Sequence, residues 1–266
     1  MLSNDGNVAI CMRVEGIKHS KCYDGWIHHL HTPEEWVTGP QFRAAVRENP
    51  ELAHKGDLHE EEWLRKIYDE LDFSEETIYR IALQLGVTED ALRRMGAGYS
   101  KKRRVIAFPM YNANGEILGI RYRSVDGKFK YAEKGGHNGI FLAKDDSVAT
   151  DNKKLIVVEG ATDFATLKAL GLNGVGRPDC QGGKQLIRDV LDAHPEIKEV
   201  DIIADCDEAG MNGAEDLASF LNCRHRIVVP PSGIKDLRQW YKTGELSSPE
   251  QLLERIQNAK LIQPMR

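Results

Sequence analysis

Acidic side chains follow two predicted strands of this 266-residue chain at the positions where the strands end. Glu159 ends an apolar run, and Asp205 and Asp207 come directly after another. Because residues i and i+2 of an extended chain point the same way, we expect Asp205 and Asp207 to project together. Crowded carboxylates repel one another unless a hard divalent cation binds, and Mg²⁺ takes one or two carboxylates together with waters and phosphates. The pattern therefore predicts a site for Mg²⁺ or Mn²⁺.

Each of these acids alone also has an ordinary interpretation. A Glu after a strand is commonly a surface residue, and Asp-x-Asp is common in loops. Three carboxylates at the ends of two strands of one sheet are more specific, and Asp236, which follows Lys235 after a further strand, adds a fourth metal-ligand candidate. Asp163, one helical turn after Glu159, could orient a metal-bound water or could only favour the start of a helix through its charge.

A basic segment lies upstream of these acids. The whole chain has a net charge of −5, which argues against a protein whose entire surface is positively charged for binding nucleic acid. Between Lys101 and Lys134, however, nine Lys or Arg residues stand against three Asp or Glu residues. Such a segment is a candidate polyanion site, and a solvated charged face is the alternative. The candidate nucleic-acid or nucleotide contacts are Arg121, Arg123, Lys128, Lys130, Lys134 and Lys235.

The basic segment has the pattern of a β-meander. Asn114-Gly115 and Asp126-Gly127 separate β-prone runs, and both dipeptides favour tight hairpin turns. Alternation along a strand would place Arg121 with Arg123 on one face, and Lys128 with Lys130 likewise, so that one face of the sheet is cationic.

Strand and helix patterns alternate from residue 153 onward. Short Val- and Ile-rich runs are each followed by a helical pattern, for example Ala214, Leu217, Ala218 and Leu221. This order predicts a parallel sheet in an α/β architecture, with ligands at the carboxyl ends of the strands. The glycine-rich stretch 174–184 could bring backbone N–H groups to a phosphate, or its glycines could serve turn geometry alone.

Two further modules precede the meander. Residues 33–98 have helical patterns, with Trp63, Leu64, Ile67 and Leu71 on one face and Ile78, Ile81, Ala82 and Leu85 on another, followed by Gly86 as a stop. Residues 1–32 lack helical periodicity. We therefore expect a connector of helices after a small irregular unit.

No apolar run is long enough to span a bilayer, and the first residues lack the pattern of a secretory signal. We therefore expect a cytoplasmic protein that does not enter a membrane. The five cysteines show no paired spacing, so we expect free thiols rather than disulfides.

Residues 153–245 resemble the Toprim domain, the metal-binding α/β unit shared by bacterial-type primases, topoisomerases and some nucleases. The matching segments are LIVVEGATD, DIIADCDEAG and GIKDLRQWYKTG, and the DEAGMNGA continuation favours the primase branch. Residues 111–144 are similar to the basic subdomain that precedes Toprim in phage primase-helicases and their relatives. The resemblance implies an α/β fold: a Toprim domain with a Rossmann-like parallel sheet, preceded by a small basic β-rich subdomain and a helical connector.

The same resemblance extends weakly to the amino terminus. NVAICMRVE and GWIHHL look like the tail of the zinc ribbon found before many phage-type primases. Cys11 and Cys22 are the candidate zinc ligands, with His19 and His28 available beside them. Their spacing lacks the paired cysteines of structural zinc sites, so we favour a buried thiol and exposed histidines over Zn²⁺. The predicted domain boundaries are 1–32 for this zinc-ribbon-like remnant, 33–98 for the connector, 99–150 for the β-rich subdomain, 151–245 for Toprim and 246–266 for a final helix.

The family implies a function. A DNA primase-like nucleotidyltransferase, from a phage-like replication system, would join ribonucleoside triphosphates into short RNA primers on single-stranded DNA. Glu159, Asp205 and Asp207 would be catalytic through the metal, with Asp236 as a further ligand. Because no Walker A motif occurs in the sequence, we expect a separate replicative helicase as partner. The alternatives are a Toprim nuclease and a non-catalytic DNA-binding replication adaptor.

Overall fold

The computed structural model describes residues 8–11, 18–19, 26–29, 58–144, 148–149 and 153–264, in two compact units that divide at residue 55. In the first unit β1 (Val8–Cys11), β2 (Lys18–His19) and β3 (Trp26–His29) form an antiparallel sheet of order β1-β3-β2. Cys11 lies at the end of β1, and Cys22 lies outside the described residues. The zinc hypothesis for these two cysteines therefore stays a prediction.

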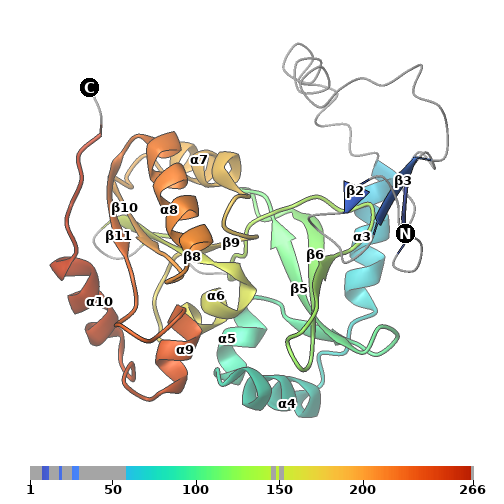
Figure 1. Cartoon of the computed structure of the whole chain (residues 1–266). Coiled ribbons are helices and arrows are strands. Elements are labelled where there is room, and N and C mark those ends of the chain that lie inside the picture. The colour runs from blue at the N-terminus through green and yellow to red at the C-terminus, as the bar shows by residue number, and fades with distance from the viewer. Residues whose placement is uncertain are drawn as a thin grey trace. The chain divides into compact units, whose positions relative to one another are not determined.

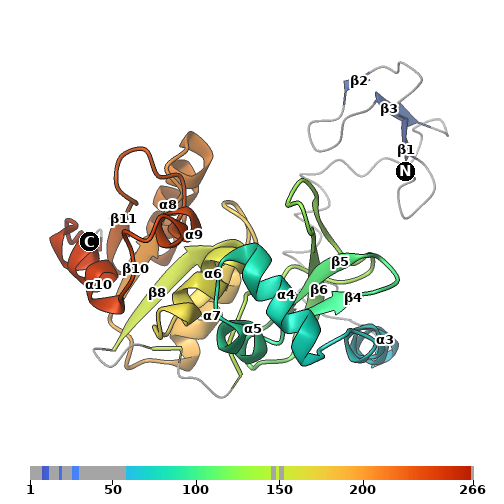
Figure 2. The same ribbon diagram turned by 90° about the horizontal axis from the view of Figure 1, so that it is seen from below.

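The second unit contains two four-stranded sheets and eight helices among the described residues (Figures 1 and 2). Its helices are α3 (Leu58–Asp69), α4 (Glu75–Leu85), α5 (Glu89–Arg94), α6 (Gly160–Ala169), α7 (Lys184–Ala193), α8 (Glu208–Leu221), α9 (Leu237–Lys242) and α10 (Pro249–Asn258). Its strands are β4 (Gly98–Ser100), β5 (Val105–Tyr111), β6 (Ile117–Ser124), β7 (Lys130–Ala132), β8 (Lys154–Glu159), β9 (Val175–Arg177), β10 (Glu199–Ile203) and β11 (Arg224–Val228). None of the helices in the described part of the chain has the length and apolar character of a membrane span.

The basic segment folds as the predicted antiparallel meander, with strand order β4-β5-β6-β7. Gly115 and Gly127, the second residues of the two turn dipeptides, have φ angles of 82° and 76°. These are left-handed conformations that glycine adopts without strain. One face of the meander packs against α3, where Tyr122 is fully buried and donates a 2.6 Å hydrogen bond from its hydroxyl to Glu133.

The second sheet is parallel and has the order β11-β10-β8-β9, which confirms the predicted α/β class. Its strands are buried on both faces. Ile156 and Val158 of β8 pack in the same core as α6 and α10, whereas Leu155 and Val157 pack in the core that holds α7 and α8. From β8 the chain continues to β9 on one side and then to β10 on the other, so the order reverses at β8. In open α/β sheets ligands bind in the crevice at such a reversal, outside the carboxyl ends of the strands.

The helical connector agrees in part with its predicted faces. Ile78, Ile81, Ala82 and Leu85 of α4 are all buried, and Gly86 ends the helix with a φ of 71°. On α3 the face is less regular, because Leu64 is buried while Trp63 is 39% exposed.

The glycine-rich stretch differs from its sequence interpretation. Residues 175–177 form strand β9 rather than a turn, and Gly176 lies within that strand. A Cβ on Gly176 would stand 2.8 Å from Phe164 and 3.1 Å from Phe141, so close packing requires glycine here. Only the later part of the stretch turns, at Gly183, which has a φ of 80°.

We predict that Gly213→Ala destabilises the fold. Gly213 lies in α8, where a Cβ would stand 2.2 Å from the carbonyl oxygen of Cys180. In an open helix the same change would stabilise by about 1 kcal/mol. Here the backbone must move, so we expect a loss of about 2 kcal/mol in the free energy of unfolding, measured by urea titration. Ser219→Ala, on the exposed face of α8, is the matched control and should stay within about 0.5 kcal/mol of the wild type.

Candidate active site

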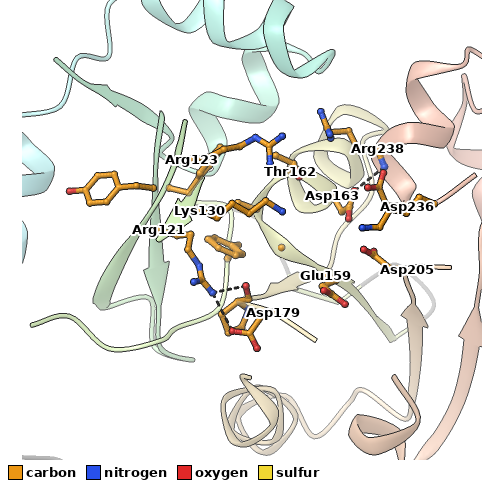
Figure 3. A pocket seen from close by; sticks show the side chains of 17 residues that line it. Arg121, Arg123, Lys130, Glu159, Thr162, Asp163, Asp179, Asp205, Asp236 and Arg238 are labelled. Carbon is orange, nitrogen blue, oxygen red and sulfur yellow. Dashed lines mark hydrogen bonds and ion pairs between the residues drawn. The ribbon is translucent and has the colours of Figure 1, made fainter. Parts of the chain in front are cut away.

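The two sheets of the second unit meet at a pocket of about 310 Å³ at the carboxyl ends of β8 and β10. The meander contributes basic side chains from one side and the parallel sheet contributes acids from the other (Figure 3). The cationic side chains that line the pocket are Arg121, Arg123, Lys130, Lys235 and Arg238. The acidic ones are Glu159, Asp163, Asp179, Asp205 and Asp236.

Glu159 and Asp205 stand on the two sides of the strand-order reversal. Glu159 is the last residue of β8 and the N-cap residue of α6, and its side chain makes no capping hydrogen bond. Asp205 lies two residues beyond β10. Burial raises the pKa of Glu159, and burial together with the charges of Glu159 and Asp236 raises the pKa of Asp205 to about 7. The pocket therefore holds carboxylates that lack enough neutralising charge.

Asp207 has different surroundings from Asp205. It is the N-cap residue of α8, where its Oδ1 accepts a 2.8 Å hydrogen bond from the N–H of Gly210. Its other oxygen lies 3.3 Å from the Nζ of Lys235. The Gly210 hydrogen bond and Lys235 lower the pKa of Asp207. Asp207 lines a neighbouring open cavity and Asp205 lines the pocket, but, together with burial, the charge of Asp207 still raises the pKa values of both Glu159 and Asp205. Joint action of the three carboxylates therefore stays a prediction.

The segment after β11 is bonded to the segment after β10. The N–H of Cys206 donates a 2.6 Å hydrogen bond to the carbonyl of Lys235. Asp236 begins α9 and accepts a 2.7 Å hydrogen bond from the N–H of Gln239. These bonds fix the positions of Lys235 and Asp236 beside Asp205.

Asp163 is the most buried acid of the pocket, with 5% exposure. It accepts a 2.8 Å hydrogen bond from the backbone N–H of Arg238, which connects α6 to α9. Burial, followed by the charges of Asp236 and Asp205, raises the pKa of Asp163 well above its usual range. Sequence reasoning left the role of Asp163 open; its position one turn after Glu159 was the available signal.

The cations of the pocket differ in their pairing, because Arg121 and Lys235 have acidic partners whereas, in the part of the chain that the structure describes, Arg123 and Arg238 keep an unpartnered Nε. Arg121 donates to the carbonyl of Pro178 at 2.8 Å and to Asp179 at 3.3 Å, across the two sheets. By contrast, the Nε groups of Arg123 and Arg238 are buried and have no partner among the described residues. Burial and the charge of Arg238 lower the pKa of Arg123, and reduced hydration and Arg123 lower that of Lys130. Free donors and crowded positive charge are the conditions under which an added anion binds.

The six predicted basic contacts divide into two groups. Arg121, Arg123, Lys130 and Lys235 line the pocket. Lys128 was expected to share a strand face with Lys130, but this expectation is wrong: Lys128 lies in the turn before β7 and pairs with Asp126 at 3.4 Å. Lys134 is exposed beyond the end of β7. Sequence reasoning missed Asp179 and Arg238, whose contacts join segments far apart in the chain.

The donor chemistry suits a divalent metal ion. Carboxylate oxygens are hard ligands, and two of them with waters and phosphates satisfy Mg²⁺. Glu159 and Asp205 provide two such groups in one pocket, and burial raises the pKa values of both, so a bound cation would favour their ionised forms. Among the described residues, no three His, Cys, Asp or Glu side chains converge as a complete protein cage. The residues present therefore fit an ion that shares its coordination with waters and substrate.

Comparisons with known proteins identify relatives of the chain and its fold. No protein-family model matches the chain. The Gene 57 protein of Mycobacterium phage D29 is 31% identical over 126 residues, which cover 45% of this chain and 76% of the phage protein. The chain belongs to the family of this phage protein.

Solved structures give the fold. A DnaG primase catalytic domain bound to single-stranded DNA superposes with a TM-score of 0.61 at 15% identity, over 77% of this chain and 81% of that one. The zinc-binding and RNA polymerase domains of Aquifex aeolicus primase superpose with a TM-score of 0.62 at 18% identity, over 84% of this chain and 68% of that one. This chain therefore has the Toprim primase-like fold that the sequence resemblance predicted.

Proposed function

We propose that this chain synthesises short RNA primers on single-stranded DNA by divalent-metal-dependent phosphodiester formation. The observation that carries the proposal is the pocket in which Arg123 of the meander and Arg238 of α9, each with a buried Nε that has no partner in the described part of the chain, lie together with Glu159 and Asp205. A metal-dependent nucleotidyl transfer needs both groups of side chains: cations that bind the phosphates of a polyanion, and carboxylates that bind the metal ion. The primase-like fold supports this assignment.

The chain's own residues have distinct parts in the proposed reaction. Arg123, Lys130 and Arg238 would bind the triphosphate or the template backbone through charge-assisted hydrogen bonds. Glu159 and Asp205 would hold the metal, with Asp207 and Asp236 as further candidates. When bound, Mg²⁺ or Mn²⁺ would lower the pKa of the attacking 3′-hydroxyl and offset charge on the leaving pyrophosphate. A separate helicase would supply the single-stranded template.

Incorporation of labelled ribonucleotides on defined single-stranded DNA, with Mg²⁺ or Mn²⁺, tests the proposal. We expect the wild type to extend products, and Arg123→Met to reduce incorporation by about 10- to 150-fold, because a charge-assisted contact to phosphate contributes roughly 1.5–3 kcal/mol. Lys198→Met is the matched control, since Lys198 is exposed before the amino end of β10, and it should keep wild-type activity.

The same assay separates the alternatives. Degradation of the template without incorporation would identify a nuclease. DNA binding with neither activity, also when a replicative helicase is added, would identify an adaptor. Either result would refute primer synthesis.

A further inference from the structure

Exposed aromatic rings gather at the outer edge of the meander, outside the pocket. Phe129 is 67% exposed and Tyr131 is 41% exposed. They lie in or beside β7, which is an edge strand of its sheet. Trp63 of α3 is 39% exposed, and its ring would touch a Cβ on Gly135, just after β7. Single exposed apolar residues are ordinary, but two exposed rings on one edge segment, with Trp63 of α3 beside the residues that follow β7, indicate a contact surface.

Strand pairing and ring packing fix the position of Tyr131. The cross-strand pairs Arg123–Lys130 and Tyr122–Tyr131 place Lys130 on the pocket side of the meander and Tyr131 on the opposite side. The Tyr131 ring is 5.2 Å from the ring of buried Tyr122, which braces it. A platform that is already ordered loses little conformational freedom when a ligand stacks on it.

Phe129 is held in a similar way. Its carbonyl accepts a 2.9 Å hydrogen bond from the N–H of Ser124, and its own N–H donates a 3.0 Å bond to the Ser124 hydroxyl. The backbone is therefore fixed on both sides while the ring faces solvent.

The charge beside the rings selects the kind of ligand. Lys128 has a side chain that is 74% exposed, and Lys134 is exposed. The nearby Glu133 is buried and paired with Arg103 at 2.6 Å, so it does not neutralise the surface. Lys128 pairs with Asp126 at 3.4 Å, but both side chains are exposed, so the pair is weak and a phosphate can compete for this lysine. Aromatic rings between lysines are typical of surfaces that bind single-stranded nucleic acid, where bases stack and phosphates meet cations. An apolar protein partner would leave these lysines without a function.

We propose that Phe129 and Tyr131 form a base-stacking platform for single-stranded DNA at the edge of the meander, with Lys128 and Lys134 beside the phosphates. This inference rests on the proposed function and extends it, because it gives the template a path over β7 toward Lys130 and the pocket. It also accounts for the two predicted basic contacts that the pocket does not contain. Bases in any sequence can stack, so the platform binds DNA without selecting a sequence.

Binding of the full chain to two labelled oligonucleotides tests the platform. One is oligo-dT, and the other has the same length but abasic sugars in place of its central nucleotides. We expect Phe129→Ala and Tyr131→Ala each to weaken oligo-dT binding by about 5- to 100-fold in fluorescence anisotropy, in line with stacking energies per base. Binding of the abasic oligonucleotide should change by less than about twofold, and Phe129→Trp should bind oligo-dT like the wild type.

The controls keep the result interpretable. Tyr79→Ala, at an α4 position that is 52% exposed, should leave both affinities unchanged. Thermal melting of each variant excludes unfolding, and the salt dependence of binding should keep its slope because no charge is removed.

Two outcomes would overturn the inference and differ from failure of the proposed function. If the wild type binds oligo-dT and the ring variants bind it equally well, the platform is absent while primer synthesis stands; a protein-docking role for the rings would give this result. If the ring variants lose both oligonucleotides equally, stacking is refuted. If the wild type binds neither, the proposed template itself is wrong.

Discussion

Asp205→Asn is expected to abolish primer synthesis and, in the same protein, to raise stability in metal-free buffer at pH 8. Synthesis should fall at least about 100-fold, because the variant loses a charged oxygen that faces Glu159 in the pocket. Stability should rise because burial and neighbouring acids raise the pKa of Asp205 to about 7, so its ionised form is disfavoured in the fold. Few substitutions at buried polar positions have this pair of effects.

The sign follows from proton linkage. A carboxyl whose pKa is higher in the folded state than in the unfolded state makes folding less favourable as pH rises from about 4 through 7. Above pH 7 the full penalty is present, and we expect about 2 kcal/mol after allowance for solvent screening. Below pH 4 both states are protonated and the penalty disappears. The stabilising effect of Asp205→Asn should therefore be large at pH 8 and small at pH 4.5.

Urea titrations in EDTA at both pH values measure this effect. Asp192→Asn, an exposed acid on α7, is the control and should change stability by less than about 0.5 kcal/mol. Adding Mg²⁺ should stabilise the wild type and leave Asp205→Asn unchanged, since a ligand that binds only the folded state raises its stability. A variant that keeps synthesis, or that is less stable than the wild type in EDTA at pH 8, would contradict this account of the pocket.

Much of the site could be predicted because it follows from local rules. The two glycine turns fix the hairpins, and period-two alternation then places Arg121 and Arg123 on one face. The carboxyl ends of parallel strands share an edge, which brings Glu159 toward Asp205. These inferences need only strand identity and direction.

The remaining features depend on competing local bonds and on long-range packing. Asp207 is the N-cap residue of α8 and accepts a hydrogen bond from the N–H of Gly210, a local bond that the strand pattern does not contain. Lys128 stands in a turn because β7 begins only at Lys130. The Arg121–Asp179 pair joins residues 58 positions apart, and no local pattern contains such a contact. Sequence periodicity therefore predicts which side chains share a face of a strand or helix better than it predicts which distant residues they contact.

The largest stability effect is expected far from the pocket, at the amino ends of the parallel strands. Arg226 of β11 lies 3.2 Å from Asp201 of β10, and Asp201 is only 2% exposed. Arg226 also bonds Glu199, which has further partners in Lys154 at 2.7 Å and Arg224 at 3.3 Å. Asp201 has an ion pair with Arg226, and the charge of Lys154 also favours its ionised form.

Arg226→Met should cost about 3–5 kcal/mol in the free energy of unfolding at pH 7.5, because it removes the hydrogen-bonded ion-pair partner of a buried carboxylate. Arg80→Met is the matched control: it breaks a surface pair with Glu76 whose side chains are 74% and 73% exposed, and it should cost less than about 1 kcal/mol. Urea titration of both variants gives the comparison.

A second substitution separates loss of the charge pair from loss of packing. If the unpaired Asp201 causes the instability, Asp201→Asn should destabilise the wild type but restore part of the stability of Arg226→Met, since a neutral amide needs no cation. The variant should also regain stability as pH falls toward 5, because burial already raises the pKa of Asp201 and removal of Arg226 would raise it further. Additive effects of the two substitutions, with no pH dependence, would show instead that Arg226 stabilises the sheet through its aliphatic contacts alone.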